Sequence, residues 1–183
     1  MHHLTAASAI LAALALAGCN KEPAKPKTTD EVVAAANKLV KPEPGQYSST
    51  AKLVEFSVPG LPPDQADRLK SMVSGMTGDK GSYCLTKEEA DKGFEEAVRK
   101  MGEGGKQMAC TFDKFDVAGN QLDAQLQCKG QMGMTATMGM TGTVGATSSD
   151  MAVKMVQKAA MIPGGEMRME LQVSSQRTGD CTG

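Results

Sequence analysis

Methionine is the residue type in this chain that most clearly suggests a chemistry. The 183 residues include 14 methionines, and three pairs are separated by a single residue: Met132-x-Met134, Met138-x-Met140 and Met167-x-Met169. Alternate residues of a strand project from the same face, so each pair places two thioethers on one surface. Thioethers are soft ligands that suit Cu(I). The candidate metal ligands are Met132, Met134, Met138 and Met140.

Three interpretations of the methionines are open. They can fill a hydrophobic core, line a cavity for an apolar ligand, or bind a soft metal. Two observations oppose a metal: side chains two apart on a strand start about 6.6 to 7 Å from each other, and no thiolate or imidazole is present to raise affinity. We therefore expect core packing, with no metal and no other cofactor, and keep the two ligand interpretations as alternatives.

Two carboxylate pairs could in principle perform general acid-base chemistry, Asp113 with Asp116 and Glu166 with Glu170. All four occupy solvent-facing positions of the hydrophobic pattern, where charges usually serve solubility. The sequence contains no HExxH, GxSxG, P-loop or dinucleotide-binding fingerprint. We expect no catalytic residues, and hence a protein that is not an enzyme.

The N-terminal residues predict export and lipid anchoring. Ala6 to Leu16 is an apolar run of about eleven residues, too short to span a bilayer and typical of a signal peptide. It ends in Leu16-Ala17-Gly18-Cys19, which resembles a bacterial lipobox, although no Lys or Arg precedes the run. We expect residues 1–18 to be removed and Cys19 to carry the lipid. Asn20 in place of Asp favours the outer membrane, and an ordinary cleaved signal is the alternative.

Removal of the leader also excludes classes of chemistry. Both histidines of the chain, His2 and His3, lie in the leader. The mature protein then lacks imidazole for general bases, nucleophile pairs and metal sites. The net charge of -1 offers no electrostatic surface for nucleic acid.

Four cysteines remain after Cys19, and an even number in an oxidising compartment predicts two disulfides. A turn at residues 118–120 predicts a hairpin in which a three-residue loop places Cys110 opposite Cys128 and Phe112 opposite Leu126. A two-residue loop would shift the register by one and mix the faces. We prefer the first register, which pairs Cys110 with Cys128 and leaves Cys84 with Cys181.

The hydrophobic pattern divides the mature chain into a tether and one domain. Residues 19–43 are rich in lysine and proline and contain a short helix that begins with the capping box Thr28-x-x-Glu31. Residues 44–183 form the domain, with helices over 64–76 and 86–101 and strands over 46–58, 81–85, 110–117, 121–128, 131–143, 151–156 and 166–173. We expect a mainly β (α+β) fold, an antiparallel meander or partly open barrel with two helices packed on it.

Five segments together resemble the domain-of-unknown-function 3617 family, a family of bacterial envelope lipoproteins. They are Pro44-Gly45-x-Tyr47, Cys84-Leu85-Thr86-x-Glu88-Glu89, the hairpin of Cys110 and Cys128-Lys129-Gly130, the Met, Gly and Thr-rich repeats, and Arg177-Thr178-Gly179-Asp180-Cys181. The resemblance implies a secreted or lipid-anchored domain and supplies no established activity. Its order of cysteines is its most specific feature.

These observations favour a non-catalytic, lipid-anchored protein of the cell envelope that faces the periplasm. We expect it to act as a binding or interaction module, with another envelope protein as its partner. The alternative is a periplasmic carrier of an apolar ligand, or of Cu(I), on the methionine-rich face.

Overall fold

A computed structural model describes residues 25–103 and 108–181, and within these residues it contains seven strands and four α-helices. The helices are α1 (Thr29–Ala36), α2 (Pro63–Met76), α3 (Lys87–Lys92) and α4 (Glu95–Glu103). The strands are β1 (Gly45–Ser57), β2 (Gly78–Leu85), β3 (Met108–Ala118), β4 (Gln121–Gly130), β5 (Thr135–Val144), β6 (Ser148–Lys158) and β7 (Glu166–Gly179). Two 3₁₀ turns, Gln131–Gly133 and Pro163–Gly165, precede β5 and β7.

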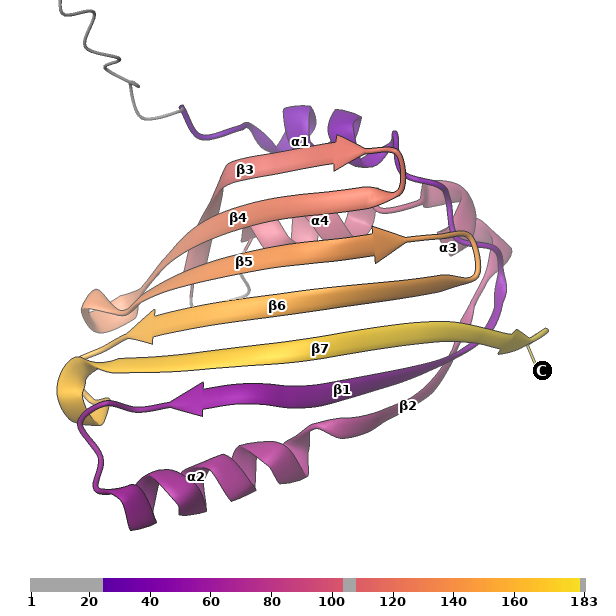
Figure 1. Cartoon of the computed structure of the whole chain (residues 1–183). Helices are drawn as coiled ribbons and strands as arrows, with labels where there is room; N and C mark the ends of the chain where they lie inside the picture. Colours follow the sequence, from indigo (N-terminus) through magenta and orange to yellow (C-terminus); the bar gives the residue numbers. More distant parts are fainter. Residues whose placement is uncertain (1–24, 104–107, 182–183) are drawn as a thin grey trace, which may run out of the picture.

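All seven strands form one antiparallel sheet in the order β2-β1-β7-β6-β5-β4-β3. Strands β3 to β7 are a meander, and β1 returns to pair with β7, so the first and last strands lie side by side (Figure 1). The expected mainly β, α+β class is confirmed. The sheet is open, with β2 and β3 as its edges, and does not close into a barrel.

The β3–β4 hairpin corrects the predicted loop. The prediction of a three-residue loop is wrong, because Ala118 pairs with Gln121 across the two-residue turn Gly119–Asn120. The predicted register nevertheless holds at the far end, where Cys110 lies opposite Cys128. A register shift between Phe112 and Lys114 joins the two alignments. Such a bulge adds one residue to one strand, so both registers that the sequence allowed occur in one hairpin.

The bulge also determines what the hairpin buries. Phe112 and Phe115 are three residues apart and would face opposite sides of a regular strand. The extra residue turns both rings to the same side, where they are buried and meet edge to face at 6.0 Å between ring centroids. The hairpin therefore presents one apolar face to the helices.

Helices α1 and α4 cover this face. The main contacts of both helices with the sheet are with β3, and they lie over the β3–β4 end of the sheet (Figure 1). The buried cluster consists of Val32, Val33, Ala36, Val98, Phe112, Phe115, Ala124 and Leu126. The short N-terminal helix therefore belongs to the core of the domain, although it lies upstream of Pro44.

The helix ends follow the sequence signals, with one correction. Both capping boxes form, Thr28 with Glu31 at α1 and Thr86 with Glu89 at α3. The single helix predicted over 86–101 is instead two, because Gly93 adopts a positive φ of 61° and ends α3. That conformation favours glycine and stops a right-handed helix.

Both edges of the sheet carry features that limit pairing with another chain. Lys27 forms an isolated bridge with Phe112 on the outer side of β3. Strand β2 contains Gly78 and Gly81, both at positive φ, and its pairing with β1 shifts register between Ser48 and Thr50. Irregular or covered edges reduce edge-to-edge association.

In the part of the chain that the structure describes, none of the helices combines the length and apolar character required to cross a bilayer.

Candidate functional site

The sheet has one apolar face, and its helical cover is incomplete. Helix contacts concentrate on β3, through α1 and α4, and on β1, through α2. Within the described residues, the principal contacts between helices and strands do not involve β6 or β7. We define the methionine face as Met138 and Met140 of β5, Met151, Val153 and Met155 of β6, Met167, Met169 and Leu171 of β7, and Leu53 and Phe56 of β1.

Strand register shows that this face is continuous. Met138 lies opposite Met155, which lies opposite Met169, and Met169 lies opposite Phe56. Every side chain of the methionine face is half-buried, and none is as enclosed as Phe112 or Leu126. A contiguous apolar surface that stays partly accessible is typical of interaction and ligand sites.

The opposite face of the same strands is polar and internally paired. Lys154 contacts Glu170 at 3.4 Å, Lys158 contacts Glu166 at 3.5 Å, and Arg168 also pairs with Glu166. The hydrogen bond from Arg168 lowers the pKa of Glu166, although burial opposes the shift. Glu166 and Glu170 thus form ion pairs and are half-buried, rather than freely solvent-facing as expected from the sequence, and their charges lie away from the methionine face.

The other carboxylate pair is arranged similarly. Asp116 lies 3.3 Å from the ammonium of Lys27 and 3.9 Å from that of Lys114. Asp113 falls at the bulge of β3, where the register with β4 shifts. Ion pairing accounts for Asp116.

The four candidate metal ligands do not come together as one set. Met132 lies in the turn before β5 with a φ of 53° and an exposed fraction of 82%. Met134 accepts a hydrogen bond on its sulfur from Nε2 of Gln157 at 3.0 Å. Only Met138 and Met140 belong to the methionine face. Met155 and Met169 lie in the same row as Met138; the sequence indicated Met169 through its pair with Met167, but strand register is needed to bring it beside Met155 and Met138.

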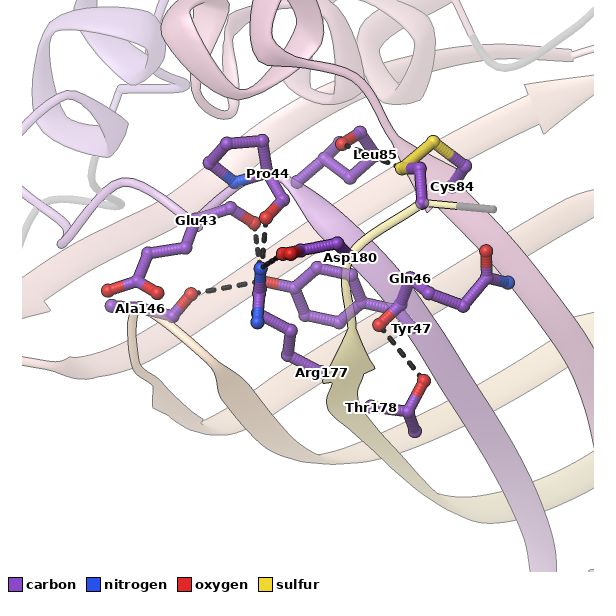
Figure 2. Close-up of polar contacts among 11 residues, drawn as sticks. Glu43, Pro44, Gln46, Tyr47, Cys84, Leu85, Ala146, Arg177, Thr178 and Asp180 are labelled. Atoms are coloured by element: carbon purple, nitrogen blue, oxygen red, sulfur yellow. Dashed lines mark hydrogen bonds and ion pairs between the residues drawn. A yellow bond between two sulfur atoms is a disulfide. The ribbon is translucent and has the colours of Figure 1, made fainter. Parts of the chain in front are cut away.

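A second region brings the end of β7 against two segments that lie more than 90 residues earlier in the chain. The start of β1, the end of β2 and the end of β7 meet at one corner, where a disulfide joins Cys84 to Cys181 with their Cα atoms 5.4 Å apart (Figure 2). The other expected disulfide joins Cys110 to Cys128 in the hairpin. Both predicted pairings are confirmed. Cys19, the predicted lipidation site, lies outside the described residues.

Arg177 organises this corner. Its Nε donates to the carbonyl of Pro44 at 2.9 Å, and its Nη2 pairs with Asp180 at 2.6 Å. Gly45 lies directly against this guanidinium, and a Cβ at residue 45 would overlap it and the carbonyl of Gly179. Gln46, the residue before Tyr47, is also held by β7, because Thr178 Oγ1 donates to the Gln46 carbonyl at 3.1 Å.

Tyr47 is the buried part of the corner. Its hydroxyl lies 2.8 Å from the carbonyl of Glu43 and 3.0 Å from that of Ala146, so it can donate to either (Figure 2). Its ring stacks on Tyr83 with centroids 5.6 Å apart. Burial raises the pKa of the Tyr47 hydroxyl. The polar groups of the corner are therefore used to hold the chain's own backbone, which indicates a structural clamp.

Residues 42–181 match the family model described as a protein of unknown function, DUF3617. The chain belongs to this family. No curated protein and no solved structure matches it. The description of DUF3617 names no activity, so membership adds none.

The corner brings together segments on which the sequence resemblance rests. Pro44-Gly45-x-Tyr47, Cys84-Leu85-Thr86 and Arg177 to Cys181 are the segments that meet there. The remaining motif cysteines staple the β3–β4 hairpin. In this DUF3617 chain these segments build the scaffold, and the methionine face is a separate surface carried by it.

Proposed function

We propose that this protein is a non-catalytic, lipid-anchored binding module of the bacterial cell envelope, and that the methionine face is its binding surface. The observation that carries the proposal is the incomplete helical cover of one apolar sheet face. Burying each exposed methylene of such a surface against a partner contributes roughly 0.8 kcal/mol. Methionine side chains are flexible, so the surface can adapt to the shape of what it binds.

The arrangement of the polar side chains supports the proposed non-catalytic role. Within residues 25–103 and 108–181 no group of three or more His, Cys, Asp or Glu side chains is placed to hold a metal. The carboxylates considered for acid-base chemistry, Asp116, Glu166 and Glu170, form ion pairs. The buried hydroxyl of Tyr47 binds backbone carbonyls. These groups serve stability and solubility.

The anchor rests on the lipobox, and its geometry limits where the domain works. Of the residues that the structure describes, Lys27 is the first that pairs with the sheet, at the outer side of β3. Seven residues, 20–26, separate it from Cys19, and such a chain reaches at most about 30 Å. A domain lipidated at Cys19 therefore stays close to the membrane, with the β3 edge nearest the anchor.

Lipidation is tested by metabolic labelling of the protein with a radioactive fatty acid in cells that express the full chain. We expect label in the wild type and its loss in Cys19→Ser, with the protein then released from the membrane fraction. Equal labelling of both chains would overturn the anchor.

The binding surface is tested with a photo-cross-linking amino acid placed at one position in the full chain in cells. Position 153 lies on the methionine face, and position 154 lies on the opposite face of the same strand as a matched control. We expect an adduct from 153 only, and its loss when Leu171→Asp adds a charge to the face. Equal adducts from both positions, or none from either, would contradict the proposed surface.

A carrier of an apolar ligand is the second candidate. The observation that favours it is the unbroken apolar row from Phe56 of β1 to Met138 of β5, which crosses four strands. Adjacent strands lie about 4.8 Å apart, so this row is about 14 Å wide. Protein purified from its native envelope would then carry a lipid that mass spectrometry detects under native conditions, and Leu171→Asp would release it.

A further inference from the structure

Three methionines form one straight row across three adjacent strands. Met138 of β5 pairs with Met155 of β6, and Met155 pairs with Met169 of β7. Residues directly opposite on neighbouring antiparallel strands have Cβ atoms about 4.5 to 5.5 Å apart. That separation is shorter than the roughly 6.6 to 7 Å between alternate residues of one strand. The row therefore gathers thioethers more closely than any of the Met-x-Met pairs does.

The side chains around the row offer no charged ligand. The neighbouring positions on the face include Val153, Leu171 and Phe56, which offer no oxygen or nitrogen, and Gln157, whose side-chain amide is hydrogen-bonded to the sulfur of Met134. The nearest carboxylates on β7, Glu166 and Glu170, project to the other face and pair with lysines there. Hard cations such as Mg²⁺ and Ca²⁺ need oxygen ligands, whereas thioethers select soft ions.

The row is partly accessible, and its β5 end, Met138, packs against the buried cluster. Met138, Met155 and Met169 are all half-buried, and the main helix contacts lie on β3 and β1. An unbranched side chain can turn its sulfur without moving the backbone. The four cysteines of the described chain are joined in disulfides and do not compete for the ion.

We propose that Met138, Met155 and Met169 bind one soft monovalent cation, Cu(I), through their three thioethers. This proposal rests on the proposed function in one respect, because it also takes the methionine face as the binding surface. It replaces pairs of ligands along one strand with a row across three strands, in which Met138 and Met169 come from two different Met-x-Met pairs.

The chain offers a matched control for the number of sulfurs. Met72, Met132 and Met161 are exposed by 63%, 82% and 72% and lie off the methionine face. Replacing these three with leucine removes the same number of thioethers as M138L/M155L/M169L does, but at positions outside the row. Met and Leu are close in volume, and such exchanges usually cost less than about 1.5 kcal/mol each. Unfolding in urea verifies that both triple variants are folded.

The purified mature protein, with disulfides intact, is titrated with Cu(I) held by a competing chromogenic chelator, and with Ag(I) as a redox-inert substitute. We expect one ion per chain, an affinity at least about tenfold lower in M138L/M155L/M169L, and an unchanged affinity in M72L/M132L/M161L. Labelled methionine methyl resonances should shift at 138, 155 and 169.

Failure to bind Cu(I), or an equal loss of affinity in the two triple variants, would overturn the metal site. Binding that persists unchanged in M138L/M155L/M169L would overturn it as well. The outcome is distinguishable from failure of the proposed function, because face-specific cross-links from position 153 do not depend on the ion. Metal binding without such cross-links would instead support the metal site and contradict a protein partner at the methionine face.

Discussion

The sheet has two halves with the same alternating pattern and different burial. In the covered half, β3 and β4, the side chains of Phe112 and Leu126 are 1% and 2% exposed beneath α1 and α4. In the open half, β5 to β7 and β1, the methionine face is only half-buried. Alternation along a strand therefore determines which side is apolar, and the helices determine how much of that side is removed from water.

The difference also concerns what stabilises each half. The covered half has an aromatic core. The open half depends on strand pairing and on the corner that Arg177, Tyr47 and the Cys84–Cys181 disulfide build. Removing individual contacts should separate these two sources of stability.

The largest effect should come from the disulfide that closes the longer loop. Cys84 and Cys181 are separated by 97 residues and Cys110 and Cys128 by 18. The chain-entropy estimate gives about 4 to 5 kcal/mol for the first and about 3 kcal/mol for the second. The free energy of unfolding in urea should therefore fall further in C84A/C181A than in C110A/C128A. The reverse order would show that the hairpin disulfide matters more.

Truncation of core side chains should distinguish the halves directly. Phe112→Ala removes a fully buried ring and should cost about 3 to 5 kcal/mol. Met155→Ala should cost about 1 to 2 kcal/mol, below the usual range for a buried methionine, because its side chain is half-buried. Urea unfolding of both variants provides the test. Equal costs would mean that something covers the open half in solution.

Tyr47→Phe should weaken the corner by about 1 to 3 kcal/mol, because the carbonyls of Glu43 and Ala146 lose a buried donor. Burial raises the pKa of Tyr47, so the folded state retains its proton longer than the unfolded state. That stabilisation is complete below pH 10 and is lost as pH rises through the raised pKa. The variant should lack this alkaline decline, and an identical decline in both proteins would assign it to another group.

The smallest effect concerns the helix that covers β3. Thr28→Ala removes the N-cap of α1 and should cost about 1 kcal/mol. Hydrogen bonds from the backbone and then the side chain of Thr28 lower the pKa of Glu31. The stabilisation that comes from the lowered pKa of Glu31 is present above about pH 4.5 and is lost as pH falls through the lowered pKa.

Hydrogen exchange should therefore quicken in β3 and β4 of T28A, relative to wild type, and the difference should shrink in acid. T86A, which alters the equivalent cap of α3, is the control and should leave exchange in β3 unchanged. Faster exchange throughout the sheet would contradict a local effect of α1.

Much of the scaffold was predictable because its signals are local. The two capping boxes, the cysteine pairing and the alternation of Met167, Met169 and Leu171 all appear in the structure. The break at Gly93 and the bulge after Phe112 were missed. A glycine inside a helical pattern can be tolerated, and a bulge changes register without changing composition.

The candidate site was less predictable because it depends on contacts between strands. The Met-x-Met pairs drew attention to residues along one strand, whereas the row of Met138, Met155 and Met169 follows from pairing across three strands. The extent of helical cover over β6 and β7 is likewise a tertiary property. Neither has a signal in the spacing of the sequence alone.

The openness of the methionine face is tested most directly by limited peroxide oxidation of the folded protein, with each methionine sulfoxide assigned by peptide mass spectrometry. Met132 and Met161, at 82% and 72% exposure, provide internal references for accessible sulfur. We predict that Met155 and Met169 oxidise in the native state, within about tenfold of the reference rates. Protection of both residues until the protein unfolds would contradict an open methionine face.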